Sequence, residues 1–180
     1  MKKKFRLEGI TEPIFGLNPG AEYGSAKRWP VENFIATAVK VQVQHDCRWL
    51  IFGGKGDAGI ARQVELGSGG GVAAINLAVR TSLRELMALL KLCRVLLTND
   101  SGPMHVAAAL GTPVVVPFGS TSPELTGPGL PGDTRHRLLK SDAPCSPCFL
   151  RECPIDFRCM YGIPVERVVT AVIEAVTAKS

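Results

Sequence analysis

The stretch VLLTNDSGPMHVAAALGTPVVV, residues 95–116, decides the fold. It contains an apolar run at 95–97, a polar turn at 99–103, a helical stretch closed by Gly111, and a second apolar run at 114–116. Apolar runs without alternating polar residues are typical of strands buried on both faces, and two such strands joined by a helix form a parallel βαβ unit. The stretch therefore predicts a parallel sheet covered by helices on both faces.

The same alternation of strands and helices continues along the rest of the chain. Ser82 and Glu85 can form a capping box at the start of one helix, and apolar residues from 165 to 176 repeat at helical spacing. The expected strands are 13–17, 49–52, 72–75, 95–97 and 114–116, and the expected helices follow residues 30, 57, 82, 101 and 164. We therefore predict a doubly wound parallel sheet, a Rossmann-like α/β domain.

The composition fits one such domain. With 180 residues, 46% apolar and 21% charged, the chain is long enough for one buried core and short for two. The net charge is +5, and four of the basic residues fall in a tail over residues 1–12: Lys2, Lys3, Lys4 and Arg6. The domain at 13–180 is then nearly neutral, which argues against a nucleic-acid partner. We expect neither a membrane span nor a secretory signal, and hence a cytoplasmic protein.

The polar loops that follow the strands form the candidate ligand site. In an open parallel sheet, ligands bind beyond the carboxyl ends of the strands. We therefore expect the loops at 18–29, 53–57, 76–81 and 99–105 to lie along one edge of the sheet.

The strongest candidates in these loops are Asp100, Ser101, Gly102 and His105, at the predicted start of a helix. The unpaired N–H groups and the positive dipole end of a helix start bind anions, and Gly102 lets a ligand oxygen approach the backbone. His105, in the first turn, can add a hydrogen bond to a phosphate. The alternative is that Asp100 or Ser101 only caps the helix and that His105 only packs.

Lys27 and Arg28 lie in the long loop after the first strand. Two adjacent cations can neutralise a diphosphate, the lysine as a point charge and the arginine as a fork. The alternative is that both side chains are solvated on the surface, as most charged loop residues are.

Residues 54–59, GKGDAG, match the G-x-G-x-x-G pattern of dinucleotide-binding proteins. That pattern predicts a dinucleotide-dependent oxidoreductase domain and requires an acidic residue about 20 positions later to hold the ribose. No Asp or Glu occurs between Glu65 and Glu85, and the next expected strand is followed by Asn76. A plain tight turn is therefore the preferred interpretation of these glycines.

Four of the six cysteines crowd into a loop at residues 144–160: Cys145, Cys148, Cys153 and Cys159. Four thiols can enclose a structural zinc ion or hold an iron–sulfur cluster, which would make the chain a metal or redox module. The spacing contains one C-x2-C pair where known sites use two, so a reversible disulfide and free thiols stay open as alternatives. Cys47 and Cys93 are expected in the core.

Several motifs together resemble the ADP-heptose:lipopolysaccharide heptosyltransferases, in particular the heptosyltransferase II type. The carrying motifs are residues 99–115, NPGA at 18–21 with KRWP at 27–30, LA at 77–78 with TSL at 81–83, FGST at 118–121 with Pro123, and the cysteine–proline motifs at 145–148 and 153–154. The resemblance spans residues 13–178. It implies one half of a two-domain glycosyltransferase fold, with this chain as the donor-binding half and the acceptor half absent.

The resemblance also implies roles for individual residues. Lys27 corresponds to the lysine that meets the donor diphosphate, with Arg28 beside it. Asp57 corresponds to an acid near the ribose, and Thr81 lies in the loop against the adenine, where Val79 replaces a frequent glycine. The positions that resemble the motif for the diphosphate and the heptose hydroxyls are Asp100, Ser101, Gly102 and His105.

The implied reaction is an inverting displacement. A hydroxyl of the lipopolysaccharide inner core attacks the anomeric carbon of heptose, and ADP leaves. Cations and helix N–H groups neutralise the leaving group, so no cofactor is required. The base is expected on the missing domain, so we expect no catalytic residue here and donor binding without turnover. Contact with the cytoplasmic face of the inner membrane is a further expectation.

Overall fold

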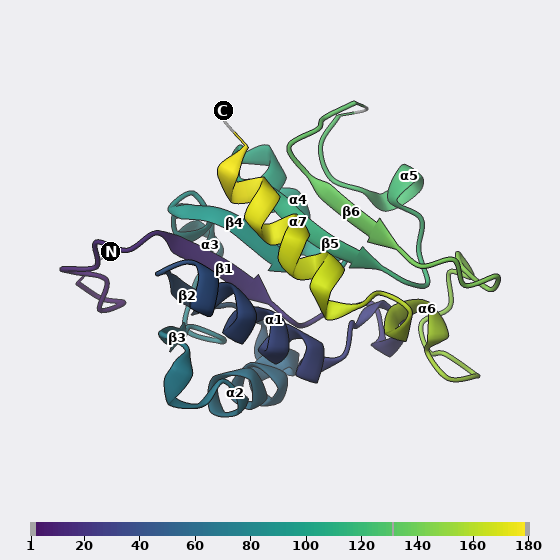
Figure 1. Cartoon of the computed structure of the whole chain (residues 1–180), viewed down its shortest axis with the longest axis horizontal. Coiled ribbons are helices and arrows are strands. Elements are labelled where there is room, and N and C mark those ends of the chain that lie inside the picture. The colour runs from purple at the N-terminus through teal and green to yellow at the C-terminus, as the bar shows by residue number, and fades with distance from the viewer. Residues whose placement is uncertain (1–2, 131, 179–180) are drawn as a thin grey trace.

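The computed structural model describes residues 3–130 and 132–178, which form a six-stranded sheet between two layers of helices (Figure 1). The strand order is β3-β2-β1-β4-β5-β6, and every neighbouring pair is parallel. This is the order of a Rossmann fold, in which the direction of strand addition reverses between β1 and β4. The predicted doubly wound α/β class is confirmed.

The elements differ from the prediction mainly at the end of the chain. The strands are β1 Ile14–Asn18, β2 Arg48–Ile51, β3 Ala74–Asn76, β4 Cys93–Thr98, β5 Val114–Phe118 and β6 Arg137–Lys140. The helices are α1 Val31–Gln44, α2 Ala58–Gly67, α3 Leu83–Leu90, α4 Gly102–Ala109, α5 Pro123–Thr126, α6 Arg158–Tyr161 and α7 Val165–Thr177. The sequence does not predict β6, α5 or α6. β6 is an edge strand in which only Leu139 is buried, so it lacks an apolar run.

A hydrophobic cluster lies on each face of the sheet. Helices α1, α2 and α7 cover one face, and α3 and α4 cover the other. Successive side chains of β2 alternate between the two clusters, with Trp49 and Ile51 in the first and Leu50 in the second. On each face of the sheet, strand and helix side chains pack into one cluster. The central strands are therefore buried on both faces, which explains why they are apolar throughout. Cys47 and Cys93 are buried in these clusters, as expected.

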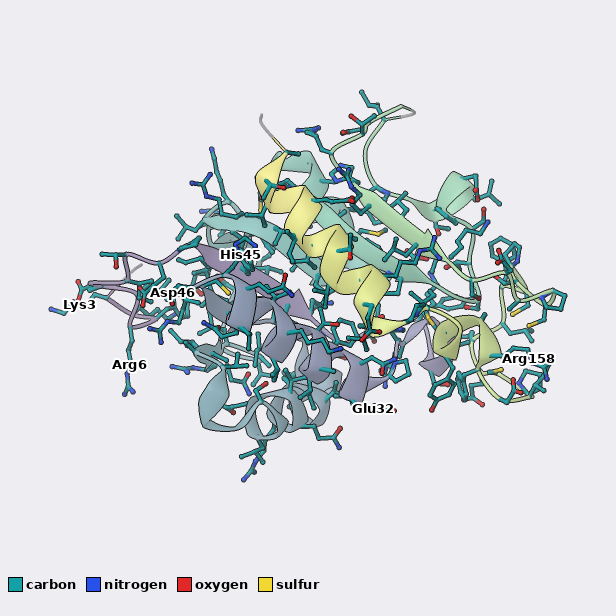
Figure 2. The ribbon with its side chains drawn as sticks, in the orientation of Figure 1. Lys3, Arg6, Glu32, His45, Asp46 and Arg158 are labelled. Atoms are coloured by element: carbon teal, nitrogen blue, oxygen red, sulfur yellow. The ribbon has the colours of Figure 1, made fainter. Side chains whose placement is uncertain are left out.

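The basic tail packs onto the domain. Phe5 and Leu7 are 1% and 2% exposed and belong to the cluster beneath α3 and α4. Packed structure therefore begins before residue 13, where the sequence suggests the domain starts. Figure 2 shows Lys3 and Arg6 pointing outward near the N-terminus, at the opposite end of the molecule from Arg158. The described cations of the tail thus stand apart from the cysteine-rich loop; Lys2 lies outside the described residues.

Candidate functional site

The four predicted loops meet beyond the carboxyl ends of the strands. They enclose a cavity of about 320 Å³, which we call the first pocket, lined by residues of all four loops and by the start of α3. The apolar part of the lining of the first pocket includes Phe52, Leu83 and Leu86. The polar part includes Asp57, Thr81 and Ser101 at the start of α4. The expectation that these loops share one edge is confirmed.

A second pocket of about 300 Å³ adjoins the first. Its lining residues are mostly charged or hydroxylated: Glu22, Tyr23, Lys27, Asp100, Ser101, Gly102, His105 and Thr126. The two pockets share Glu22, Ser101 and Gly102. The start of α4 therefore lies between the two pockets.

The start of α4 is open to a ligand. Ser101 occupies the N-cap position, but its hydroxyl donates to the Asn99 carbonyl at 3.2 Å and makes no side-chain cap to the helix. A Cβ atom built on Gly102 would meet no heavy atom within 4 Å, so the space beside this backbone belongs to the pockets. His105 is exposed on the first turn and lines the second pocket. The alternative is that Asp100 or Ser101 only caps the helix and that His105 only packs. Among the described residues no side chain caps α4, and His105 is exposed, so the geometry favours the ligand interpretation, which stays a prediction.

Lys27 and Asp100 form a buried ion pair at the floor of the second pocket. Lys27 Nζ lies 2.8 Å from Asp100 Oδ2, and the two side chains are 11% and 4% exposed. The same oxygen accepts hydrogen bonds from Thr121 Oγ1 at 2.7 Å and Thr126 Oγ1 at 2.9 Å. Because the pair is desolvated and hydrogen-bonded, the ammonium group is held in one place before any ligand arrives.

Two asparagines fix the loop that carries Lys27 against the loop that carries Asp100. Asn99 Nδ2 donates to the Pro19 carbonyl at 2.7 Å, and Asn99 Oδ1 accepts from the Trp29 backbone N–H at 2.9 Å. Asn18 Nδ2 reaches Thr98 Oγ1 at 3.2 Å. These bonds cross between β1 and β4, so the point where the strand order reverses is also the most rigidly connected part of the site.

Arg28 does not join Lys27. Its guanidinium donates to the Ala21 carbonyl through Nε at 3.3 Å and Nη2 at 3.0 Å, and it lines neither pocket. Lys27 ends a short 3-10 turn and Arg28 is extended, so their side chains leave the backbone in different directions. Nη2 lies 3.9 Å from Asp57 Oδ1. The structure therefore brings Lys27 into the second pocket and places Arg28 beside Asp57, so a diphosphate contact of Lys27 stays a prediction.

With this geometry in view, the sequence matches glycosyltransferase family 9 (heptosyltransferase) over residues 1–157. The chain belongs to this family. A lipooligosaccharide heptosyltransferase 2 of Campylobacter jejuni is 34% identical over 159 residues, which cover 87% of this chain and 49% of that protein. A lipopolysaccharide heptosyltransferase 2 of Salmonella typhimurium is 40% identical over 118 residues, 64% of this chain and 34% of that protein. This chain spans about half the length of its family 9 relatives.

Solved family 9 structures have the same fold. The ADP-heptose lipopolysaccharide heptosyltransferase II of E. coli superposes with a TM-score of 0.77 at 26% identity, over 97% of this chain and 50% of that one. A family 9 glycosyltransferase from Veillonella parvula gives a TM-score of 0.81 at 24% identity, over 99% and 51% of the two chains. The predicted resemblance and the glycosyltransferase class are confirmed.

Asp57 and Thr81, which the family resemblance assigns to the nucleoside, both line the first pocket. Asp57 Oδ2 accepts the Gly54 backbone N–H at 2.9 Å. A Cβ on Gly20 would lie 2.1 Å from the Asp57 carboxyl carbon, so glycine is required there. Val79, at the position where the family frequently has glycine, has a φ of 58°. A β-branched residue is strained in this left-handed region, so the backbone keeps the conformation that glycine favours.

The glycine pattern at 54–59 does not form a dinucleotide site of the usual kind. It follows β2, whereas the fingerprint belongs to the turn after the first strand, next to the reversal point. Lys55–Asp57 forms a 3-10 turn, and Asn76 at the end of β3 supplies no carboxylate. Family membership and this placement both disfavour the oxidoreductase alternative.

The four cysteines of the 144–160 loop are free thiols in the structure. Burial raises the pKa of the Cys159 thiol, and the nearby Cys145 raises that pKa further. Cys153 Sγ accepts the Phe157 backbone N–H at 3.3 Å. Among the described residues, no three His, Cys, Asp or Glu side chains stand together as a metal-binding group. Four thiols suit zinc or iron chemically, so the metal site stays a prediction, to be tested by elemental analysis of the purified protein.

Four residues that line the second pocket or contact Asp100 beneath it are absent from the predicted site: Glu22, Tyr23, Thr121 and Thr126. The Tyr23 ring lies 4.7 Å from Lys27 Nζ and 5.1 Å from the Arg151 guanidinium carbon. Thr121 and Thr126 follow β5, whose carboxyl end faces the same edge as the predicted loops. Their position in a polar loop after a parallel strand could have identified the two threonines from the sequence, because every such loop reaches this edge of the sheet.

Proposed function

We propose that this chain is the donor-binding half of a heptosyltransferase that transfers heptose from ADP-heptose to a lipopolysaccharide core. The observation that carries the proposal is the uncapped start of α4, which lies between two adjoining pockets and shares the second of them with the buried Lys27. The name of the E. coli heptosyltransferase II, whose structure matches over nearly all of this chain, supports ADP-heptose as the donor.

The two pockets divide the donor between them. The adenine lies in the apolar part of the first pocket, against Leu83 and Leu86, and Asp57 accepts a ribose hydroxyl. The diphosphate lies at the shared wall, where the N–H groups of the α4 start and Lys27 meet it. The heptose then occupies the second pocket, beside Asp100 and His105.

The chemistry that this half supports is departure of the diphosphate. An acceptor hydroxyl oxygen bonds to the anomeric carbon, the bond from that carbon to the diphosphate oxygen breaks, and ADP leaves with the electron pair. Negative charge grows on the leaving oxygen, so a fixed ammonium group and helix N–H donors stabilise the transition state more than the ground state. Lys27 and the α4 start supply this charge neutralisation, and the proposal includes no metal ion for the step.

The base that takes the proton of the acceptor hydroxyl belongs, in this proposal, to the other half of the enzyme. The whole enzyme would work at the cytoplasmic face of the inner membrane, where its lipid-linked acceptor is presented. Within residues 3–130 and 132–178, no helix is both long and apolar enough to cross a bilayer.

Calorimetric titration of the chain with ADP, ADP-heptose and NAD tests the proposal. We expect binding of ADP and ADP-heptose, and affinities for both that fall at least tenfold in Lys27→Ala because a buried charge contact to the diphosphate is lost. Lys27→Gln removes the charge but keeps a donor for Asp100. Comparison of the two Lys27 variants therefore distinguishes an effect of the lost charge from an effect of lost folding. Arg28→Ala is the matched cation control and should change either affinity less than about threefold, because Arg28 lines neither pocket.

Two results would reverse the proposal. The first is binding of NAD with no response to ADP-heptose, which would restore the oxidoreductase alternative. The second is an unchanged ADP affinity in both Lys27 variants. A transfer assay on the chain alone should give no heptosylated product, since product would place the base within these residues.

A further inference from the structure

One oxygen of Asp100 is fully engaged and the other is not. Oδ2 accepts from Lys27 Nζ, Thr121 Oγ1 and Thr126 Oγ1 at 2.8, 2.7 and 2.9 Å. Within the part of the chain that the structure describes, nothing donates to Oδ1, and Oδ1 is not among the fully buried polar atoms that lack a partner. It therefore reaches solvent, and Asp100 lines the second pocket.

The two threonines differ in how firmly they hold Oδ2. Thr121 is 3% exposed, lines neither pocket, and has one acceptor for its single hydroxyl proton. Thr126 lines the second pocket, and its proton is shared between Asp100 Oδ2 and the Ser122 carbonyl at 3.1 Å. The bond from Thr121 is thus the permanent one, and Thr121 sits too deep to touch a ligand.

The consequence for the carboxylate is a fixed rotation about its Cβ–Cγ bond. The terminal torsion of an aspartate is broad, so Lys27 alone could donate to a carboxylate whose plane is turned over a wide range. A buried hydroxyl that donates to one oxygen fixes the plane, because turning it part-way would move both oxygens out of reach and leave the hydroxyl unpaired. With one oxygen, Oδ2, held by Thr121, the equivalent second oxygen, Oδ1, is the one presented to the pocket.

We propose that Thr121 is a positioning residue for sugar recognition. It locks Asp100 so that Oδ2 orients Lys27 while Oδ1 accepts a hydroxyl of the donor sugar. The inference rests on the proposed function, since it assumes a nucleotide sugar across the two pockets. It adds a specific expectation: Thr121 affects the affinity for the sugar portion of the donor, and affects the affinity for ADP little.

The experiment compares ADP with ADP-heptose for three variants of the full chain. Thr121→Val keeps the shape and removes the hydroxyl, and Thr121→Ser keeps the hydroxyl. Thr112→Val is the matched control: Thr112 is 4% exposed and donates to the Leu90 carbonyl at 2.9 Å, at the amino end of β5 and away from both pockets. Each variant is titrated with both ligands, and its melting temperature is recorded.

We expect Thr121→Val to lose about tenfold in affinity for ADP-heptose and less than about threefold for ADP, as for one hydrogen bond to a charged group. Thr121→Ser should bind both ligands within about twofold of the original chain, and Thr112→Val should melt earlier with an unchanged ratio of the two affinities. If Thr121→Val does not fold, Thr121→Ser and Thr126→Val carry the test, with Thr126→Val expected to lower the ADP-heptose affinity about threefold.

Several results would overturn the inference. Equal losses for ADP and ADP-heptose in Thr121→Val would make Thr121 a merely structural residue, and no loss for either would show that the carboxylate needs no lock. A Thr121→Ser variant with the ADP-heptose affinity of Thr121→Val would exclude the hydroxyl as the cause. An unmodified chain that binds neither ligand would reject the proposed function itself. An unmodified chain that binds ADP and ADP-heptose with equal affinity would reject only the contact between Asp100 and the sugar.

Discussion

The two pockets on either side of the α4 start are built differently. The first pocket is lined by glycines, by apolar side chains and by polar groups such as Asp57 and Thr81, next to a local capping box at Ser82. The second is walled by charged and hydroxyl groups whose partners lie far apart in the chain, as in the Lys27–Asp100 pair, 73 positions apart. The first recognises a ligand by shape and backbone approach. The second depends on a buried polar network that must be complete, so the pockets should respond differently to substitution.

The largest expected effect is that of Asp100→Asn in the second pocket. The change leaves Lys27 without a charged partner in a nearly buried position, so we expect the free energy of unfolding to fall by about 3 kcal/mol. Urea denaturation measures this, and ADP-heptose binding should be lost. Asp57→Asn in the first pocket is the control, with a fall below about 1 kcal/mol, since an amide oxygen still accepts the Gly54 N–H. Equal losses of unfolding free energy in Asp100→Asn and Asp57→Asn would contradict the difference between the two pockets.

Gly102→Ala, at the wall that both pockets share, should separate binding from folding. Its Cβ meets no protein atom, so we expect an unchanged or higher melting temperature. The same methyl group stands where a phosphate oxygen approaches the backbone, so ADP affinity should fall at least tenfold. Gly20→Ala provides the contrast, because its Cβ would clash with the Asp57 carboxylate and lower the melting temperature. Unchanged ADP binding in Gly102→Ala would move the diphosphate away from α4.

The smallest effect is expected from Val79→Gly, in the loop that the family resemblance assigns to the adenine. Relief of the left-handed strain exceeds the added freedom of glycine in the unfolded chain, so we expect about 1 kcal/mol of stabilisation with unchanged ADP affinity. Val43→Gly, on the exposed face of α1, should instead destabilise by about 0.5 kcal/mol. Thermal melting of both variants checks the opposite signs. A destabilised Val79→Gly would mean that this position is not strained.

The sequence predicts the fold and the loops that line the pockets better than it predicts the contacts between those loops. The all-apolar runs of β1, β2, β4 and β5 identify a parallel sheet, and the sheet brings the loops to one edge. Local signals suffice there, as the Ser82 capping box shows. The opposite directions of Lys27 and Arg28 depend on a single 3-10 turn that no periodic pattern reveals.

The hydrogen bonds of the second pocket escape prediction because they are long-range, although the sequence predicts most of its lining residues. Thr121 reaches Asp100 only because β5 lies beside β4 in the sheet, and the sequence contains no local sign of that hydrogen bond. The edge strand β6 and the short helix α5 escape for a related reason, since short, half-exposed elements carry too little hydrophobic periodicity. Phe5 and Leu7 are buried in the cluster beneath α3 and α4, whose other members come from distant parts of the sequence and meet only after folding.

The central claim is that the open start of α4 holds the donor diphosphate. Titration of the ¹⁵N-labelled chain with ADP, followed by amide chemical shifts, tests it most directly. We predict that the backbone N–H signals of Ser101 and Gly102 move most, because these donors face the shared wall of the two pockets. The largest shifts at Gly53–Gly56, with Ser101 and Gly102 unmoved, would place the phosphates on the glycine turn after β2 and contradict the claim.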